Sequence, residues 1–347
     1  MDLDLLVIGD SSAGWQGAVA AAQRGYQVGL IAPCGSSDTS TSDLRQISST
    51  VLDDAYADWP RSRTVKHAAL RRAASAPWIQ FADNLKATWR SEIGRYRHQH
   101  LVAGGQIWTG SAAFTGIHSV HIDAPGSASV ELSAQHTLIA TGTQSQRPPF
   151  ASGDFPGVFD AARLLDASAL PKAASIVGAG VTGLRAACLL AWWGVHVRVL
   201  DSRSSQSLLH DDEASDLLLQ AEGLGVTFDL SEDVIGLQSA AGRRVMITFE
   251  SGRRAEADSV WLATGRRGRT DELQLECAEL STDDCGRLWC GAQLRTWTAS
   301  ICAVGDVVGY SPETGSESEL VSQAVHALLG NVVKDSRSLR NAHTIQV

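Results

Sequence analysis

The sequence predicts an α/β protein built of two three-layer domains, each a parallel sheet covered by helices on both faces. Two observations predict this class. An apolar strand that runs into a glycine turn and then into an apolar helix occurs twice, near residues 3–31 and near residues 175–200. The length of 347 residues also suits two domains of about 150 residues each.

The first copy starts almost at the N-terminus. Residues 3–8 form a short, near-continuous apolar run that ends at Gly9, which is typical of a strand buried on both faces. An alanine-rich stretch up to Arg24 predicts a helix, Gly25 ends it, and residues 28–31 predict the next strand. The order is therefore strand, turn, helix, strand.

The second copy repeats this order. Residues 175–177 predict a strand, a glycine turn opens an apolar helix that ends at Trp193, and residues 195–200 predict the next strand. Each copy has the pattern of the βαβ unit found in Rossmann-like dinucleotide-binding domains.

The remaining elements fill the space between and after the two copies. Residues 61–100 predict a mostly helical stretch, and alternating segments at residues 106–109, 117–122 and 130–132 predict a small antiparallel layer. Further strands are predicted at residues 226–228, 245–249, 260–263 and 301–304, and helices at residues 217–222 and 319–329.

Composition and charge exclude several function classes. The chain is 44% hydrophobic and 19% charged and lacks an apolar run of about 18 residues, so we expect a soluble globular protein with no membrane span. The net charge of −9 argues against nucleic acid or anionic membrane as partners. The sequence shows no leader-like start, and its six cysteines are scattered, so we expect a cytoplasmic protein.

The second glycine turn carries a complete dinucleotide pattern. Gly178 permits the tight turn, Gly180 lets the backbone approach a pyrophosphate, and Gly183 lets the helix pack against the strand. Asp201 ends the following strand, where a carboxylate accepts hydrogen bonds from the ribose of NAD and disfavours NADP. Arg203 lies close enough to soften that preference.

The first glycine turn is less complete. Gly9 and Gly14 hold the outer positions, but Ser11 takes the middle one, where we expect its side chain to point at an approaching pyrophosphate. Ala32 stands at the end of the next strand, and an alanine cannot bind a ribose hydroxyl. Taken alone, this turn predicts dinucleotide binding only weakly.

An ordered set of motifs makes the whole chain resemble the two-dinucleotide flavoproteins of the pyridine nucleotide-disulfide oxidoreductase family. The set comprises LVIG at residues 6–9, IATG at 139–142, IVGAGVTG at 176–183, ATGR at 263–266 and AVGD at 303–306. Residues 263–271 (ATGRRGRTD) and 303–310 (AVGDVVGY) are most similar to those of the soluble pyridine nucleotide transhydrogenases within this family.

The resemblance implies an NAD(P)-binding domain inserted in an FAD-binding domain. Residues 1–150 and 271–347 would form the two parts of the FAD-type domain, and residues 151–270 would form the NAD(P)-type domain. It also implies cofactor contacts from each of the motifs, with Asp306 at the ribityl and phosphate region of FAD. The residues implied in binding are Gly9, Ser11, Gly14, Thr141, Gly142, Gly178, Gly180, Gly183, Asp201, Arg203, Gly265, Gly305 and Asp306.

The chain departs from the family in its redox residues. The family has a Cys-x₄-Cys pair, or a remnant of it, followed by a lysine after the first copy, but residues 36–49 contain neither a cysteine nor a lysine. The family's glutamate that pairs with this lysine is replaced by Arg185. Cys285 and Cys290 share the spacing but lie in a polar loop, so a redox role is disfavoured. No catalytic side chain and no metal site is indicated.

Two functions remain open at this stage. The first is an oxidoreductase in which a hydride passes from NADH to FAD and on to an unidentified acceptor without a redox disulfide. The second is a catalytically degenerate, flavin-free protein of the same fold that binds nucleotides or docks a partner. The family's C-terminal interface domain is not found before Val347, so we expect a different oligomer or a protein partner in its place.

Overall fold

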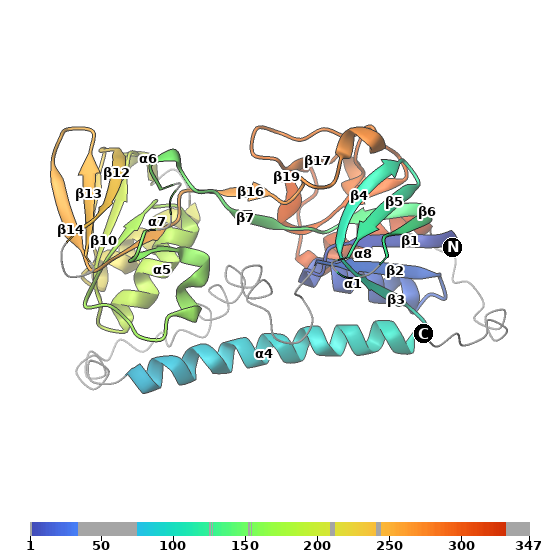
Figure 1. Cartoon of the computed structure of the whole chain (residues 1–347), viewed down its shortest axis with the longest axis horizontal. Helices are drawn as coiled ribbons and strands as arrows, with labels where there is room; N and C mark the ends of the chain where they lie inside the picture. The colour runs from blue at the N-terminus through green and yellow to red at the C-terminus, as the bar shows by residue number, and fades with distance from the viewer. Residues whose placement is uncertain are drawn as a thin grey trace. The chain divides into compact units, whose positions relative to one another are not determined.

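The computed structural model describes residues 2–33, 75–124, 126, 128–151, 153, 155–208, 212–240 and 244–330 (Figure 1). These residues divide into two compact units. Unit 1 comprises residues 2–33, 90–144 and 267–330, and unit 2 comprises residues 75–89 and 145–266. Cys34 and the segment at residues 36–49 lie outside the described residues. Each unit contains one of the two glycine turns found in the sequence.

Unit 1 is built on a seven-stranded sheet. Its strands are β1 (Asp2–Ile8), β2 (Val28–Ala32), β3 (Gln106–Thr109), β4 (Ser111–Gly116), β5 (Ser119–Asp123), β6 (Val130–Ile139) and β18 (Ile301–Ala303). Five of them are parallel, in the order β3, β2, β1, β6 and β18. This is the strand order of a doubly wound dinucleotide-binding domain, so the predicted fold class is confirmed for this unit.

One part of the predicted antiparallel layer is wrong. The segment at residues 106–109 is β3, which pairs in parallel with β2 and places Ile107 opposite Leu30. The strand follows helix α4 (Ser75–Val102), and a strand that follows a helical crossover pairs in parallel with its neighbour. The antiparallel layer is instead formed by β4, β5 and the first half of β6.

The sheet of unit 1 is buried on both faces. Helices α1 (Ser12–Ala22) and α8 (Glu317–Leu329) pack on one face, where β1 contributes Leu5 and Val7 to the core. Leu6 and Ile8 of the same strand pack on the opposite face. Because successive side chains of a strand point to opposite faces, this double burial explains the nearly continuous apolar run, which only Asp4 interrupts.

Unit 2 contains a five-stranded parallel sheet in the order β11, β10, β9, β15 and β8. A separate three-stranded antiparallel sheet has the order β12, β13, β14. The strands are β8 (Val158–Asp160), β9 (Ala173–Val177), β10 (His196–Asp201), β11 (Thr227–Leu230), β12 (Val234–Ser239), β13 (Val245–Phe249), β14 (Arg254–Ala257) and β15 (Ser259–Leu262). The parallel sheet again matches the predicted class.

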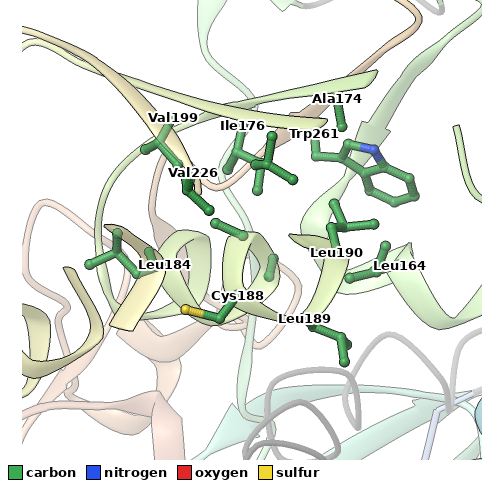
Figure 2. Packing of buried hydrophobic residues seen from close by; sticks show 14 of the residues in the cluster. Leu164, Ala174, Ile176, Leu184, Cys188, Leu189, Leu190, Val199, Val226 and Trp261 are labelled. Atoms are coloured by element: carbon green, nitrogen blue, oxygen red, sulfur yellow. The ribbon is translucent and has the colours of Figure 1, made fainter. Parts of the chain in front are cut away.

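Helices α5 (Val181–Trp192) and α7 (Asp212–Gly223) pack together on one face of the parallel sheet of unit 2. Figure 2 shows Leu190 of α5 beside Trp261 of the sheet, and Leu184 on the side of Val199 and Val226. Burying one such leucine side chain contributes about 2 kcal/mol. Cys188 is fully buried in the same cluster, as expected for a core residue.

None of the helices in the described part of the chain is both long and apolar enough to cross a membrane. The longest is α4, with 28 residues, and its sequence carries charged residues along most of its length. Its first half belongs to unit 2 and its second half to unit 1.

Candidate functional site

The glycine turns lie at the carboxyl edges of the two parallel sheets. Turn 1, residues 9–14, joins β1 to α1, and turn 2, residues 178–183, joins β9 to α5. Ligands of doubly wound folds bind outside the carboxyl ends of the strands, where helix N-termini supply unpaired N–H groups and a partial positive charge. Both turns therefore lie where a dinucleotide would bind.

Turn 2 depends on its three glycines for close packing and for an open backbone. Gly178 has φ +111°, and a Cβ there would lie 2.2 Å from the carbonyl oxygen of Ala263. A Cβ on Gly183 would lie 1.9 Å from the carbonyl oxygen of Gly178. In contrast, a Cβ on Gly180 would meet no atom closer than Arg203 Nη2, at 4.0 Å. The outer glycines are thus required by packing, and the middle glycine leaves a hollow that a side chain would fill.

Turn 2 also leaves helix N–H groups available for an anion. Gly180 is the N-cap of α5 and offers no side-chain cap, and its carbonyl accepts the N–H of Leu184. The N–H groups of residues 181–183 have no acceptor among the described residues. A diphosphate fits such a site because it can accept several of these hydrogen bonds at once.

Asp201 lies beside turn 2 with both carboxylate oxygens engaged. Oδ2 accepts the N–H of Ala179 at 2.6 Å and Nη2 of Arg203 at 2.8 Å, and Oδ1 accepts the N–H and Nε of Arg203 at 2.8 and 3.0 Å. Its side chain is only 7% exposed, whereas that of Arg203 is 48% exposed. Burial alone would raise the pKa of Asp201, but the hydrogen bonds and charge of Arg203 and the N–H of Ala179 bring it below its usual value.

Gly265 lies a little further along the chain, after β15. It has φ +117°, and its carbonyl oxygen accepts the N–H of Gln146 at 2.9 Å. A Cβ on Gly265 would meet the Gln146 side chain at 3.6 Å. Ala263, two residues earlier, flanks Gly178, so this motif continues the wall of turn 2.

Turn 1 has the same outer glycines as turn 2. Gly9 has φ +113°, and a Cβ there would lie 2.4 Å from the carbonyl oxygen of Ala140. A Cβ on Gly14 would lie 2.4 Å from the carbonyl oxygen of Gly9. The close approach of strand, turn and helix is therefore built in the same way in both units.

The Ser11 hydroxyl points differently from our expectation. It donates to the carbonyl oxygen of Ala140 at 2.8 Å and accepts the N–H of Gly14 at 3.2 Å, which makes Ser11 the N-cap of α1. The hydroxyl is therefore turned into the protein, because these two backbone groups satisfy it. The N–H groups of Ser12 and Ala13 still lack an acceptor among the described residues.

Three distant segments of the sequence meet around turn 1. A Cβ on Gly9 would lie 2.7 Å from the backbone nitrogen of Thr141. A Cβ on Gly305 would lie 3.4 Å from the Cβ of Ala13, at the first turn of α1. This convergence follows from the pairing of β6 with both β1 and β18, which aligns the carboxyl ends of the three strands.

The candidate residues that follow β6 and β18 are also linked to each other. The Thr143 hydroxyl donates to Asp306 Oδ2 at 3.4 Å. Gly142, with φ +68°, accepts the N–H of Arg269 through its carbonyl at 3.0 Å. The carboxylate of Asp306 therefore lies beside Thr143, in the segment that follows β6.

The strand ends beside the two turns differ. β2 ends at Ala32, which is 5% exposed and whose carbonyl accepts the N–H of Gly110. This position corresponds to Asp201 at the end of β10, so unit 1 offers no carboxylate there.

Sequence reasoning missed a polar contact at the start of α1. Gln16 Nε2 donates to Glu317 Oε1 at 2.9 Å and to the Ser12 hydroxyl at 3.0 Å. Glu317 keeps access to solvent, but nearby protein atoms raise the pKa of its carboxyl by desolvation, against hydrogen bonds from Ser12 and Gln16. The helix start at Ser316 is visible in the sequence as a capping box with Glu319, but the contact to α1 is not.

The described cysteines divide into buried and exposed thiols, and all are free. Burial raises the pKa of Cys290 to about 11 and that of Cys302 to about 12. Cys285, which is separated from Cys290 by four residues, is exposed. A buried thiol of such high pKa is a poor nucleophile at neutral pH.

Comparison with known proteins identifies the family. The sequence pattern described as pyridine nucleotide-disulphide oxidoreductase matches residues 3–328. The soluble pyridine nucleotide transhydrogenase of Sodalis glossinidius is 29% identical over 320 residues, covering 89% of this chain and 66% of the relative. That of Mycobacterium tuberculosis is 28% identical over 316 residues, covering 89% of this chain and 67% of the relative. The chain thus spans about two thirds of the length of these relatives.

Solved structures share the fold. The flavoprotein disulfide reductase RclA of Escherichia coli superposes with a TM-score of 0.75 at 22% identity, covering 95% of this chain and 72% of that chain. LpdA of Mycobacterium tuberculosis superposes with a TM-score of 0.75 at 22% identity, covering 94% and 73%. RclA is described as a flavoprotein, and the two relatives are described as pyridine nucleotide transhydrogenases. The chain belongs to the pyridine nucleotide-disulphide oxidoreductase family.

Proposed function

We propose that this protein is an FAD- and NAD(P)H-dependent oxidoreductase that delivers electrons to an acceptor without a redox disulfide. The observation that carries the proposal is the presence of two glycine turns, each with unpaired helix N–H groups at the carboxyl edge of a parallel sheet. Two such sites in one chain suit one flavin dinucleotide and one nicotinamide dinucleotide. We assign residues 1–150 and 271–347 to the FAD-type domain and residues 151–270 to the NAD(P)-type domain. Residues 75–89 are an exception, because they pack within unit 2.

In the proposed flavin site, turn 1 binds the diphosphate of FAD. The N–H groups of Ser12 and Ala13 would donate to it, and the Ser11 hydroxyl does not block them because it faces Ala140. Asp306 would bind the hydroxyl groups of the ribityl chain, since a carboxylate accepts hydrogen bonds from them. Thr141 and Gly142 would pass beside the cofactor, where the backbone of Gly142 adopts a positive φ of 68°.

In the proposed nicotinamide site, turn 2 binds the diphosphate of NAD(P)H. The N–H groups of residues 181–183 would donate to it across the open surface of Gly180. Asp201 and Arg203 lie at the end of the next strand, on the side where the adenosine ribose of a dinucleotide is held. Gly265 extends the wall next to Gly178.

The cofactors supply the chemistry in this proposal. Bound FAD can accept two electrons from a nicotinamide and pass them on. The residues of this chain would position the two dinucleotides and exclude side reactions. Residues 36–49 contain no cysteine, and Cys290 is a buried thiol with a raised pKa, so electron transfer through a protein disulfide is not part of the proposal.

A rival function keeps the fold and loses the flavin. Ala32 offers no ribose-binding carboxylate in unit 1, and the carboxylates of Asp306 and Glu317 both lie near the start of α1. Negative charge beside a diphosphate site weakens binding. Such a protein would bind NAD(P)H at turn 2 and act as a nucleotide sensor or docking module.

The test starts from protein refolded or purified with excess FAD. We expect the protein to retain flavin through gel filtration and to lose the yellow colour of the flavin when NADH or NADPH is added without oxygen. Loss of all flavin during purification, together with no oxidation of NAD(P)H, would rule out the oxidoreductase. Binding of NAD(P)H to flavin-free protein without turnover would support the rival function.

A further inference from the structure

The side chain of Glu317 lies against the start of α1, next to turn 1. Glu317 is the first residue of α8, and its Oε1 accepts Gln16 Nε2 at 2.9 Å. The Ser12 hydroxyl also hydrogen-bonds this carboxylate, and Gln16 Nε2 lies 3.0 Å from the Ser12 oxygen. Ser12 is the first residue of α1, and its backbone N–H would donate to the diphosphate in the proposed flavin site. The carboxylate of Glu317 is therefore hydrogen-bonded to a residue of that site.

The packing of α8 against α1 fixes the position of this carboxylate. Val321 and Val325 of α8 belong to the same buried cluster as the inner face of α1. A Cβ on Gly17 of α1 would lie 3.6 Å from Val321 and 3.8 Å from Val325. The far end of α8 is held by the Tyr26 hydroxyl, which donates to the carbonyl oxygen of Leu329 at 2.9 Å. The first turn of α8 therefore cannot move away from turn 1 without breaking core contacts.

The two turns differ in what accompanies the carboxylate beside them. At turn 2, Asp201 Oδ2 pairs with the charged Arg203 Nη2 at 2.8 Å. At turn 1, Glu317 receives hydrogen bonds from neutral side chains of α1, a helix whose residues 12–22 include no ionisable side chain. Neutral donors stabilise a carboxylate but do not offset its charge.

The charges that act on Glu317 from the neighbouring elements are negative as well. They come from Asp306, which follows β18, and from Glu92 on α4. Glu319, the other acid in the first turn of α8, accepts the N–H and the hydroxyl of Ser316 in the capping box. Desolvation by nearby protein atoms, together with the charges of Asp306 and Glu92, raises the pKa of the Glu317 carboxyl. A further anion at turn 1 would raise this pKa again.

We propose that the Glu317 carboxylate is an internal anion that competes with the diphosphate of FAD for the positive end of α1 and thereby lowers the affinity of turn 1 for FAD. The inference deepens the proposed function and rests on it for the presence of FAD at turn 1. The N-terminus of a helix stabilises a nearby anion, and Glu317 already receives part of this stabilisation. A diphosphate that binds beside the carboxylate is also repelled by its charge. Turn 1 therefore binds FAD more tightly when the carboxyl is neutral.

The test removes the charge and keeps the shape of the side chain. Glu317→Gln retains an oxygen that can accept Gln16 Nε2, and FAD is titrated by calorimetry into flavin-free wild type and variant. We expect the variant to bind FAD about 10-fold more tightly at about 0.1 M salt. The difference should shrink at about 1 M salt, because salt screens the repulsion. Loss of a purely structural contact would weaken FAD binding, so the direction of the change identifies the charge as its cause.

Matched variants separate this charge from other effects. Glu272→Gln removes the same charge from an exposed position of unit 1 outside turn 1 and should leave the FAD affinity unchanged. Glu317→Asp keeps the charge and should stay close to the wild-type affinity. Glu317→Ala is a second neutral variant, which should also bind FAD more tightly than the wild type. The affinity of turn 2 for NADPH should be the same in all of these proteins.

The pH dependence of FAD binding reads out the same charge independently. Because a bound diphosphate raises the pKa of Glu317 further, FAD binding to the wild type should take up protons. The FAD affinity of the wild type should therefore rise as the pH falls from about 7 to about 5. Glu317→Gln should show a smaller rise over this range, since only groups such as Asp306 and Glu92 remain to titrate.

The outcomes that overturn the inference differ from those that overturn the proposed function. Unchanged or weaker FAD binding in both neutral variants of Glu317, or an equal gain in Glu272→Gln, would contradict the role of Glu317 while leaving FAD binding intact. FAD binding by Glu317→Gln but not by the wild type would support the inference and contradict the flavin-dependent function. If neither the wild type nor any variant binds FAD, the proposed function fails together with the inference.

Discussion

The two glycine turns share their outer positions and differ at the middle one. In both, a Cβ on the first or third glycine would lie 2.4 Å or less from a backbone carbonyl oxygen. At the middle position turn 2 has Gly180, which leaves three helix N–H groups available, whereas turn 1 has Ser11, whose hydroxyl takes one of them. The outer glycines are therefore required by the packing of the fold, and we expect the middle residue and the next strand end to determine what binds.

The largest expected effect concerns the third glycine. Gly183→Ala should destabilise unit 2 by about 3 kcal/mol, because its Cβ would lie 1.9 Å from a backbone oxygen that cannot move away. Gly14→Ala should cost less in unit 1, because the corresponding separation is 2.4 Å. Urea unfolding followed by tryptophan fluorescence measures both changes.

Gly223→Ala is the control for these two variants. Gly223 is the last residue of α7 and its Cβ would meet no atom within 4 Å, so alanine should stabilise by about 0.5–1 kcal/mol. If Gly183→Ala unfolds at the same urea concentration as this control, the packing account of the turns is wrong.

The second prediction compares the residues at the two strand ends, which are Asp201 in unit 2 and Ala32 in unit 1. Asp201→Asn should destabilise unit 2 by about 2 kcal/mol at neutral pH, because charge-assisted hydrogen bonds to Ala179 and Arg203 are weakened. The pKa of Asp201 is below its ordinary value of 3.8 in the folded protein, so its contribution is present above that pH. It is lost as the pH falls through the lower folded pKa.

The pH profile checks the sign of this contribution. Urea midpoints of unit 2 in the wild type should fall as the pH drops below about 4, and the difference from Asp201→Asn should shrink over the same range. Ala32 cannot titrate, so no such contribution arises from the corresponding position of unit 1. If the difference in urea midpoint between Asp201→Asn and the wild type stays constant at acidic pH, the charge of the Asp201 carboxylate does not contribute to stability.

The third prediction exchanges the middle residues of the turns. Gly180→Ser should lower the affinity for NAD(P)H about 10-fold, because a hydroxyl at the N-cap would compete for a helix N–H group and fill the hollow. Ser11→Gly should change stability by only a few tenths of a kcal/mol, and FAD affinity should not fall. Calorimetric titration of each variant measures the affinities, and unchanged NAD(P)H binding in Gly180→Ser would show that the middle glycine has no role in approach.

The smallest expected difference between the units concerns their thiols. Cys188 of unit 2 and Cys290 and Cys302 of unit 1 have raised pKa values, at about 12, 11 and 12, because all three are buried. A thiol-labelling reagent at neutral pH should therefore modify Cys277 and Cys285 in minutes and leave these three unmodified in the native protein. Peptide mass spectrometry identifies the labelled positions. A disulfide between Cys285 and Cys290, or rapid labelling of Cys290, would support a redox role for this pair.

Local pattern was sufficient to predict the parts of the molecule that depend on neighbours in sequence. The two βαβ units and their outer glycines can be predicted from apolar runs and turns within about 30 residues. The parallel pairing of residues 106–109 could not be predicted in this way, because it depends on the preceding helix and on β2.

The site depends more strongly on distant contacts. The direction of the Ser11 hydroxyl is set by Ala140, 129 positions away, and Gln16 meets Glu317, 301 positions away. Asp201 and Arg203 are only two residues apart, yet the sequence pattern could not decide whether the arginine binds the carboxylate or a ligand. The choice between competing hydrogen-bond partners is set by the three-dimensional structure.

Identical substitutions at the two middle positions test whether each turn holds its own dinucleotide. FAD and NADPH are titrated by calorimetry into the wild type, Ser11→Leu and Gly180→Leu. If each turn holds its own dinucleotide, Ser11→Leu loses affinity for FAD alone and Gly180→Leu loses affinity for NADPH alone. Simultaneous loss of both ligands in either variant, or unchanged binding of both ligands in both variants, would contradict it.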